Sequence, residues 1–328
     1  MIKDGRDPHV IAQAAQALAR GELVGMPTET VYGLGARADD DAAVTRIFTA
    51  KGRPADHPLI VHVCDAAQAE AFAEGQMPPL ARKLMDHFWP GPLTVIVPRA
   101  PNMAAAAAGG QDSVGLRCPA HPVARALLAA ARAAGVAGVA APSANRFGRI
   151  SPTHAAHVAE EFGPELLVLD GGECEVGIES SIVDCSRGHP VLLRPGVLTA
   201  EQLEAALGEP LRAADPAAPR ASGTLEAHYA PRATLRLLDG AQLVELAAKQ
   251  SLVGLAVYSR SPFSGGSGLL LRAMPQDAAA AAHELFAVLR ELDAAGAREI
   301  WVENPPAGSA WDGVRDRLSR AAAAFASG

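Results

Sequence analysis

Short apolar runs alternate with amphipathic segments along most of the chain, and this alternation limits the fold more than any other feature. The runs 93–97, 113–117 and 136–140 have the length of strands, and residues 121–134, between the last two, have helical spacing. Strands that alternate with helices imply a sheet covered by helices. We therefore expect an α/β fold.

A stretch rich in proline and alanine divides the 328 residues into two parts. Pro210, Pro216 and Pro219 lie in this stretch and hydrophobic periodicity is lost there, which is typical of an interdomain linker. We predict a large domain over residues 1–208. A linker or lid over 209–232 and a small Rossmann-like α/β domain over 233–328 should follow it.

Charge and composition exclude several classes of protein. The formal net charge of −7 argues against a chain that grips nucleic acid over its whole surface. The N-terminus has no apolar signal segment, and no run approaches the roughly 18 apolar residues of a membrane span, so we expect a cytoplasmic protein. Cys64, Cys118, Cys174 and Cys185 form no C-x-x-C pair, which predicts reduced thiols and no metal held by protein side chains.

A match to the dinucleotide-binding fingerprint is misleading. Gly33, Gly35 and Ala38 satisfy G-x-G-x-x-A, but the preceding strand is expected to end near Met26, and the fingerprint requires a direct turn from strand to helix. The chain also has no G-x-x-x-x-G-K-[ST] sequence, so it is not a P-loop enzyme.

Polar side chains crowd into the segment 27–35, which we expect to be a loop after that strand. Thr28, Glu29, Thr30 and Tyr32 bring hydroxyl, carboxylate and phenol groups to a strand end, where α/β sheets place ligands. A polar turn in which threonine side chains bond to nearby backbone would have the same composition. Both interpretations stay open on this segment alone.

Two further motifs carry groups that suit a phosphate. Lys51 and Arg53 flank a glycine at the end of a predicted helix, and their point charge and planar fork match phosphate oxygens. Cations at a helix C-terminus are also favoured by the helix dipole alone. Ser143 and Asn145 follow an apolar strand and a rigid proline.

Other polar residues also fall at predicted strand ends. Ser113 and Arg117 share one face of a strand, and His62 and Arg194 end two others. Because such ends meet at one edge of a sheet, we expect a basic, hydroxyl-rich cleft that handles a nucleoside triphosphate.

Taken together, these motifs resemble the threonylcarbamoyl-AMP synthase family. Its catalytic domain has the YrdC-like fold, a twisted mixed sheet flanked by helices. His228-Tyr229 and the C-terminal part resemble the two-domain branch of that family. The segments that carry the resemblance, in the family's order, are PTETVYGL (27–34), KGRP (51–54), PLIVH (58–62), WPGPLT (89–94), APSAN (141–145), GIESSIVD (177–184) and RPG (194–196).

The resemblance implies a nucleotidyltransferase. L-Threonine, bicarbonate and ATP, with Mg²⁺ accompanying the ATP, would give L-threonylcarbamoyl-AMP and pyrophosphate, the first step of a tRNA modification. The product would pass to a threonylcarbamoyl-transferase complex, and a weak contact with tRNA is left open. The family pattern places Lys51, Arg53, Ser143 and Asn145 at the catalytic centre, Thr30, His62, Arg117, Ala141 and Ser181 at threonine, and Arg53, His57, Ser113, Ser143, Ser151, Arg194 and Tyr229 at ATP.

Three positions depart from the family pattern, and two other functions compete with it. His57 stands where asparagine is usual, and Ser113 and Ser181 stand where threonine is common. One alternative is a non-catalytic RNA-binding module that uses the basic cleft. The other is carbamoyl transfer in hydrogenase maturation, but proteins of that kind carry C-x-x-C zinc fingers, which this chain lacks.

Overall fold

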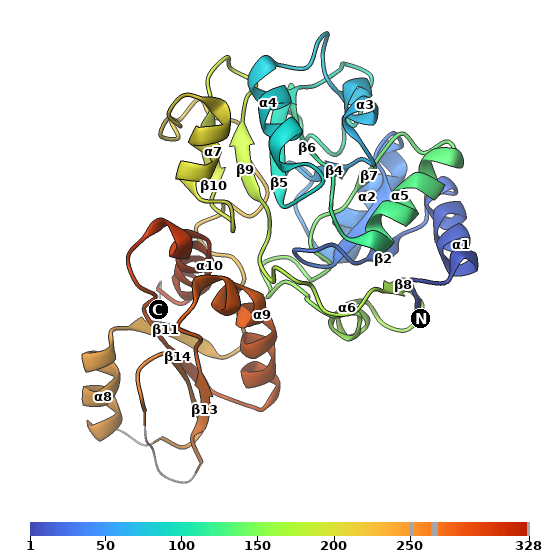
Figure 1. The fold of residues 1–328 in the computed structure, drawn as a ribbon. Helices are drawn as coiled ribbons and strands as arrows, with labels where there is room; N and C mark the ends of the chain where they lie inside the picture. The colour runs from blue at the N-terminus through green and yellow to red at the C-terminus, as the bar shows by residue number, and fades with distance from the viewer. Residues whose placement is uncertain (250–251, 264–267, 327–328) are drawn as a thin grey trace. The chain divides into compact units, whose positions relative to one another are not determined.

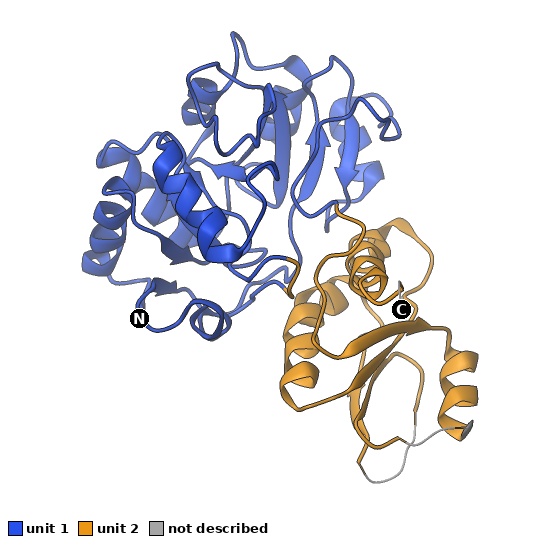
Figure 2. Ribbon diagram, turned by 180° about the vertical axis from the view of Figure 1, so that it is seen from behind, with its two compact units in different colours: residues 1–147, 151–224 blue, residues 148–150, 225–328 orange. Residues whose placement is uncertain are grey.

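The chain folds into two compact units in a computed structural model, which describes residues 1–249, 252–263 and 268–326 (Figure 1). Unit 1 comprises residues 1–147 and 151–224, and unit 2 comprises residues 148–150 and 225–328 (Figure 2). The division after Thr224 falls inside the segment 209–232 that we predicted as a linker. The first part of that segment folds with unit 1 and the rest with unit 2.

Unit 1 is built on a ten-stranded mixed sheet in the order β1-β8-β2-β3-β7-β4-β6-β5-β9-β10. Parallel and antiparallel pairs both occur, so the expected mixed sheet is confirmed. The strands are β1 (Ile2–Asp4), β2 (Val24–Met26), β3 (Gly33–Arg37), β4 (Ile60–His62), β5 (Leu93–Pro98), β6 (Ser113–Arg117), β7 (Val139–Ala140), β8 (Leu167–Asp170), β9 (Ser181–Asp184) and β10 (Val191–Arg194).

Both faces of this sheet carry a hydrophobic core. Neighbouring residues of one strand belong to different clusters, as Val168 and Leu169 do in β8, because successive side chains point to opposite faces. Helices α1 and α5 pack together in the smaller cluster, and α2 and α4 contribute to the larger one. The helices of unit 1 are α1 (Pro8–Ala19), α2 (Asp41–Lys51), α3 (Ala66–Ala69), η1 (Glu70–Phe72), α4 (Pro79–Phe88), α5 (Pro122–Ala133), α6 (Ala155–Phe162) and α7 (Ala200–Leu207).

Strand β3 corrects the predicted loop over residues 27–35, which ends at Tyr32. Its sequence, GLGAR, has two glycines and no β-branched residue, so it carries no strand signal. The structure explains one of those glycines by close packing, because a Cβ on Gly35 would lie 3.0 Å from a methyl group of Val139. The dinucleotide fingerprint therefore lies in a strand, where it cannot form the required turn.

Unit 2 contains a separate sheet of four parallel strands, β11-β14-β12-β13, and helices α8 and α9 follow β11 and β13 along the chain. This arrangement confirms the predicted Rossmann-like unit. No helix in the described part of the chain combines the length and apolar character needed to cross a membrane. The elements are β11 (Thr234–Leu238), α8 (Gly240–Lys249), β12 (Leu255–Ser259), β13 (Leu270–Ala273), α9 (Ala278–Ala294), β14 (Glu299–Glu303), η2 (Ser309–Trp311) and α10 (Asp312–Ala323).

Candidate functional site

Lys51, the last residue of helix α2, reaches the loop that carries Ser143 and Asn145. Its Nζ donates to the carbonyl oxygens of both residues, each at 2.5 Å, and Lys51 is buried. Gly52 ends the helix at φ 65°, a left-handed conformation that glycine adopts without strain, and the chain continues directly to Arg53. Burial, followed by the charge of Arg53, holds the pKa of the Lys51 ammonium well below its usual range.

The loop after strand β7 is joined to the segment around the start of strand β3 by backbone hydrogen bonds. Leu34 N donates to the carbonyl oxygen of Pro142 at 2.8 Å, and Ala144 N donates to that of Tyr32 at the same distance. Two motifs that are more than 100 residues apart in sequence therefore form one continuous region beside Lys51.

Two buried arginines converge on Ser222. Arg53 Nη2 donates to Ser222 Oγ at 3.4 Å, and Arg194 Nη1 donates to the carbonyl oxygen of the same residue at 2.8 Å. Arg53 is also held by the carbonyl oxygen of Pro58 at 2.9 Å, and its guanidinium lies 5.8 Å from the ring centroid of Phe147. The two guanidinium groups create a positive region that suits phosphate oxygens.

Residues predicted to contact the nucleotide also lie near this region. His57 packs edge-on against Phe147, with 5.3 Å between ring centroids, and its pKa is lowered by burial and then by Arg53. Ser151 Oγ donates to Glu179 Oε1 at 2.5 Å. The negative charge of Glu179 raises the pKa of Lys51, against the larger effect of burial.

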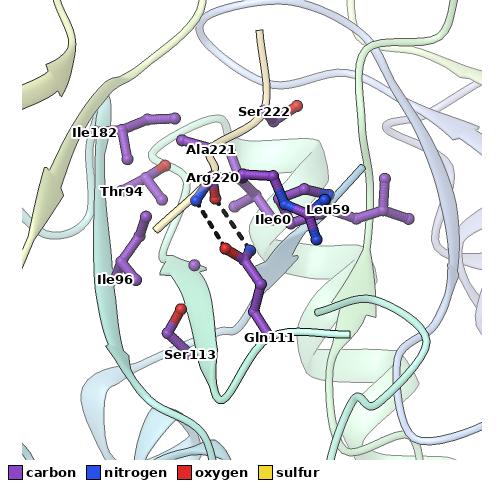
Figure 3. Close-up of a pocket in the computed structure, with 12 residues that line it drawn as sticks. Leu59, Ile60, Thr94, Ile96, Gln111, Ser113, Ile182, Arg220, Ala221 and Ser222 are labelled. Carbon is purple, nitrogen blue, oxygen red and sulfur yellow. Dashed lines mark hydrogen bonds between the residues drawn. The ribbon is translucent and has the colours of Figure 1, made fainter. Parts of the chain in front are cut away.

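A pocket in unit 1 lies between strands β5, β6 and β9 and the segment 220–222 (Figure 3). Ser113 and Gly115 line it from β6, and Arg117 is the next residue on the same face of that strand. Figure 3 shows Gln111 facing the backbone of Arg220, to which it is joined by two hydrogen bonds. The apolar lining residues are Pro58, Leu59, Ile60, Ile96, Ile182 and Ala221, and the polar ones are Thr94, Gln111, Ser113, Arg220 and Ser222.

Arg117 belongs to a buried polar network with the loop after strand β2. Its Nη1 donates to Thr30 Oγ1 at 2.8 Å, and its Nη2 donates to Glu29 Oε1 at 2.7 Å. The other carboxylate oxygen of Glu29 accepts from Ala120 N at 3.1 Å. Burial alone would raise the pKa of Glu29, but Arg117 and these N–H donors bring it below its ordinary value. Glu29 is therefore ionised beside Arg117.

His62 lies in register with Arg117 on the adjacent parallel strand. It is 2% exposed, and its Nδ1 has no hydrogen-bond partner among the described residues. Burial and then the charge of Arg117 lower the pKa of the imidazole to about 3, so the ring is neutral at ordinary pH. A neutral imidazole with an unsatisfied buried nitrogen is suited to a polar group of a ligand.

Ala141 and Ser181 are both buried, Ala141 directly after strand β7 and Ser181 at the start of strand β9, and three strands separate β7 from β9 in the sheet. Ala141 N donates to the carbonyl oxygen of Ile60 at 3.0 Å, and Ser181 Oγ donates to that of Leu198 at 3.2 Å. Gly196 is required here, because a Cβ at that position would lie 2.5 Å from Ser181 N. The glycine of the RPG motif thus permits a close backbone approach to β9.

Tyr229 lies in unit 2, whereas the other predicted site residues lie in unit 1. Its ring is buried, 5.4 Å from that of Phe286 between centroids, and the guanidinium of Arg317 lies 5.4 Å from its centroid. Its φ of 64° is uncommon for a residue with a large side chain. Its contribution to ATP binding stays a prediction.

Glu29, Glu179, Gln111 and Ser222 take part in the site but were not among the predicted site residues. The two glutamates belong to the segments 27–34 and 177–184 that carry the family resemblance, so their carboxylates could have been predicted as partners of Arg117 and Ser151. Gln111 and Ser222 carry no local signal. Among the described residues, no group of three or more His, Cys, Asp or Glu side chains is arranged to hold a metal ion.

Two family models together match most of the chain. One, described as telomere recombination, matches residues 16–196, and the other, described as the C-terminal domain of threonylcarbamoyl-AMP synthase, matches residues 198–323. The structure has all four cysteines as free thiols.

Relatives and solved structures agree with these matches. The threonylcarbamoyl-AMP synthase of Pyrococcus abyssi is 38% identical over 324 residues, which cover 94% of this chain and 92% of that protein. The Bacillus subtilis protein of the same name is 44% identical over 241 residues, which cover 71% of this chain and 68% of that protein. A crystal structure of P. abyssi Sua5 complexed with L-threonine has a TM-score of 0.86 at 35% identity and covers 96% of this chain and 95% of that one.

Proposed function

The chain belongs to the threonylcarbamoyl-AMP synthase family, and we propose that unit 1 performs the reaction of that family with the residues described above. L-Threonine, bicarbonate and ATP give L-threonylcarbamoyl-AMP, pyrophosphate and water. The observation that carries the proposal is the contact of Lys51 with the Ser143–Asn145 loop. Arg53, which contacts Ser222, follows Lys51 closely in the sequence. The protein is thus a nucleotidyltransferase.

L-Threonine is assigned to the region around Thr30, His62 and Arg117. A guanidinium binds a carboxylate with two parallel N–H donors, so Arg117 is suited to the substrate carboxylate. The unsatisfied Nδ1 of His62 is suited to the substrate hydroxyl. A P. abyssi relative has been crystallised with L-threonine, which supports this substrate. Ala141 and Ser181 complete the proposed contacts.

ATP is assigned to the pocket of Figure 3 and the adjoining arginines. Its isoleucine and leucine side chains suit the flat apolar faces of a base, and Ser113 suits a polar group of the nucleoside. The triphosphate would lie near Arg53 and Arg194, whose donors reach Ser222 in this structure. His57, Ser143 and Ser151 are proposed as further contacts.

The chemistry requires positioning and charge stabilisation. The amine of threonine combines with bicarbonate to give an N-carboxylate and water. An oxygen of that carboxylate then attacks the α-phosphorus of ATP, and pyrophosphate leaves. No residue needs to become covalently attached, so Lys51, Arg53, Ser143 and Asn145 act by holding the reactants and offsetting the charge that develops.

Mg²⁺ is proposed to arrive with ATP. Such an ion usually keeps several waters and binds through substrate phosphates and one or two carboxylates. When bound, the ion would neutralise charge on the triphosphate. We further propose that the segment 209–224 acts as a lid over the nucleotide, because its residues 220–222 line the pocket.

The partners further along the modification are also proposals. The adenylate would pass to a threonylcarbamoyl-transferase complex, with a weak contact with tRNA left open, and the reaction would take place in the cytoplasm. The test of the function is pyrophosphate release from ATP and bicarbonate, with L-threonine, with L-serine and with neither. Release that depends on L-threonine is expected. ATP turnover that ignores both amino acids would refute the assignment, and RNA binding without turnover would favour an RNA-binding module.

A further inference from the structure

We propose that Thr28 and Glu29 are positioning residues that make the Thr30–Arg117 pair a receptor for a zwitterionic α-amino acid. This inference rests on the function proposed above and names the feature of the substrate that the site reads. The residues concerned, Thr28, Glu29, Thr30 and Arg117, are called the amino-acid cluster below. All four are less than 5% exposed.

The direction of each hydrogen bond in the amino-acid cluster follows from its acceptors. Thr28 Oγ1 lies 2.6 Å from the carbonyl oxygen of Val31, which can only accept, so the hydroxyl proton of Thr28 is donated there. Thr28 Oγ1 lies 2.9 Å from Thr30 Oγ1, and it has no second proton to donate. A hydrogen bond across this contact therefore has Thr30 as its donor, and Thr28 Oγ1 also accepts from the backbone N–H groups of Thr30 and Val31, each at 3.2 Å.

Arg117 supplies the other constraint on Thr30. A guanidinium has no acceptor, so the 2.8 Å contact is a donation from Arg117 Nη1 to Thr30 Oγ1. The proton of Thr30 is already directed to Thr28, and one lone pair receives Arg117. Thr30 can still offer a ligand its second lone pair, which accepts a hydrogen bond from an ammonium or hydroxyl group. It cannot donate to a carboxylate.

Glu29 sets both the orientation and the net charge of Arg117. Among the described residues, the guanidinium uses three of its five N–H groups, donating to Gly91 O, Thr30 Oγ1 and Glu29 Oε1. Two donors remain for a carboxylate. Since Glu29 offsets the positive charge, the amino-acid cluster as a whole is close to neutral and should prefer a zwitterion to a ligand with net negative charge.

The amino-acid cluster therefore presents one acceptor beside two donors, the complement of the ammonium and carboxylate groups on one α-carbon. An independent observation points to a ligand here. His62 lies in register with Arg117 on the next strand, and it keeps an unsatisfied nitrogen in a buried position. A third polar group on the ligand, such as a hydroxyl, would satisfy it.

Thr28 provides the sharpest test, because valine keeps the shape of threonine without its hydroxyl, whereas serine keeps the hydroxyl without the methyl group. The binding of L-threonine and of ATP to the full-length protein is measured by calorimetry for the parent, Thr28→Val and Thr28→Ser. Valine keeps the shape but lets Thr30 rotate its proton toward the ligand. We expect Thr28→Val to weaken L-threonine binding about tenfold, the weight of an oriented hydrogen bond to a charged group. Its kcat at saturating threonine and its ATP binding should stay close to the parent values, and Thr28→Ser should bind L-threonine within about threefold of the parent.

Three outcomes would overturn the proposal: unchanged L-threonine binding in Thr28→Val, an equal loss in Thr28→Ser, or a matching loss of ATP binding that marks general damage. A ligand comparison on the unmodified protein covers the case in which Thr28→Val does not fold. 2,3-Dihydroxybutanoate replaces the ammonium by a hydroxyl and carries net charge, so it should bind at least tenfold more weakly than L-threonine. Equal binding would refute the receptor. If the parent binds L-threonine but releases no pyrophosphate, the proposed function fails while these comparisons still decide the role of Thr28.

Discussion

The side-chain amide of Gln111 pairs with the backbone of Arg220, although the two residues are 109 positions apart in sequence. Arg220 N donates to Gln111 Oε1 at 2.7 Å, and Gln111 Nε2 donates to the Arg220 carbonyl oxygen at 3.1 Å. The Arg220 side chain adds bonds to Asp56 and to the carbonyl oxygen of Gly109. Gln111 therefore fixes the segment 220–222 at the pocket, where Ser222 meets Arg53.

Gln111→Leu should release this segment, because both amide hydrogen bonds disappear together. We expect faster tryptic cleavage after Arg212 and Arg220 and a KM for ATP that rises roughly three- to tenfold, the weight of about one net hydrogen bond. Gln13→Leu is a matched control, since Gln13 on helix α1 accepts a hydrogen bond from Lys3 on strand β1 and does not line the nucleotide pocket. Cleavage and KM values equal to those of the control would mean that Gln111 does not hold the segment.

Arg53→Ala should lower turnover by roughly 10²–10³, the usual effect of losing one donor that stabilises a transition state. The guanidinium would be removed from the region where we place the triphosphate. Pyrophosphate release at saturating ATP and threonine is the measurement. Arg20→Ala serves as the control, because Arg20 pairs with Glu22 in the same unit and both are largely exposed. Near-normal release by Arg53→Ala would remove Arg53 from the catalytic role.

Glu29 should make the protein more stable at neutral than at acid pH. Its folded-state pKa is depressed, so its contribution is present above the ordinary glutamate value of about 4.3 and is lost as the pH falls through the folded-state pKa. Glu29→Gln leaves the buried Arg117 without its counter-ion. The variant should lose roughly 3–5 kcal/mol at pH 7, and the loss should shrink as the pH is lowered below 4.

Urea unfolding of parent and Glu29→Gln at pH 7 and pH 3.5 checks this sign. Glu22→Gln provides the contrast, because the exposed Arg20–Glu22 pair should change stability by less than about 1 kcal/mol. A Glu29→Gln loss that is the same at both pH values would show that Glu29 stabilises by shape and not by charge.

The α/β class and the strand-end position of most site residues could be predicted from the sequence, because apolar periodicity and turn chemistry are local signals. Strand β3 could not be predicted, since Gly33 and Gly35 serve close packing between strands and give no local preference. Nor could the sequence predict that Gln111 and Arg220 would pair, because both are polar residues in irregular segments brought together only by the folded sheet. The network of Glu29 with Arg117 lies between these cases, since one motif supplied the carboxylate and a separate strand the cation.

His62 should make stability fall between pH 7 and pH 5, the opposite of a histidine that gains a charged partner on folding. The pKa of its buried imidazole is lowered to about 3 in the folded protein, whereas an unfolded histidine titrates near 6.5. Below that pH the unfolded chain binds a proton at His62 that the folded chain does not bind, so His62 alone should lower the free energy of unfolding by about 2 kcal/mol on going from pH 7 to pH 5.

His62→Gln keeps a neutral polar group without the titration and should remove most of that loss. Urea unfolding at the two pH values gives the difference, and taking it against the parent cancels the partly buried His57 and His121, whose pKa values are also lowered. An equal drop in parent and variant would mean that His62 is charged, or accessible to water, in the folded protein.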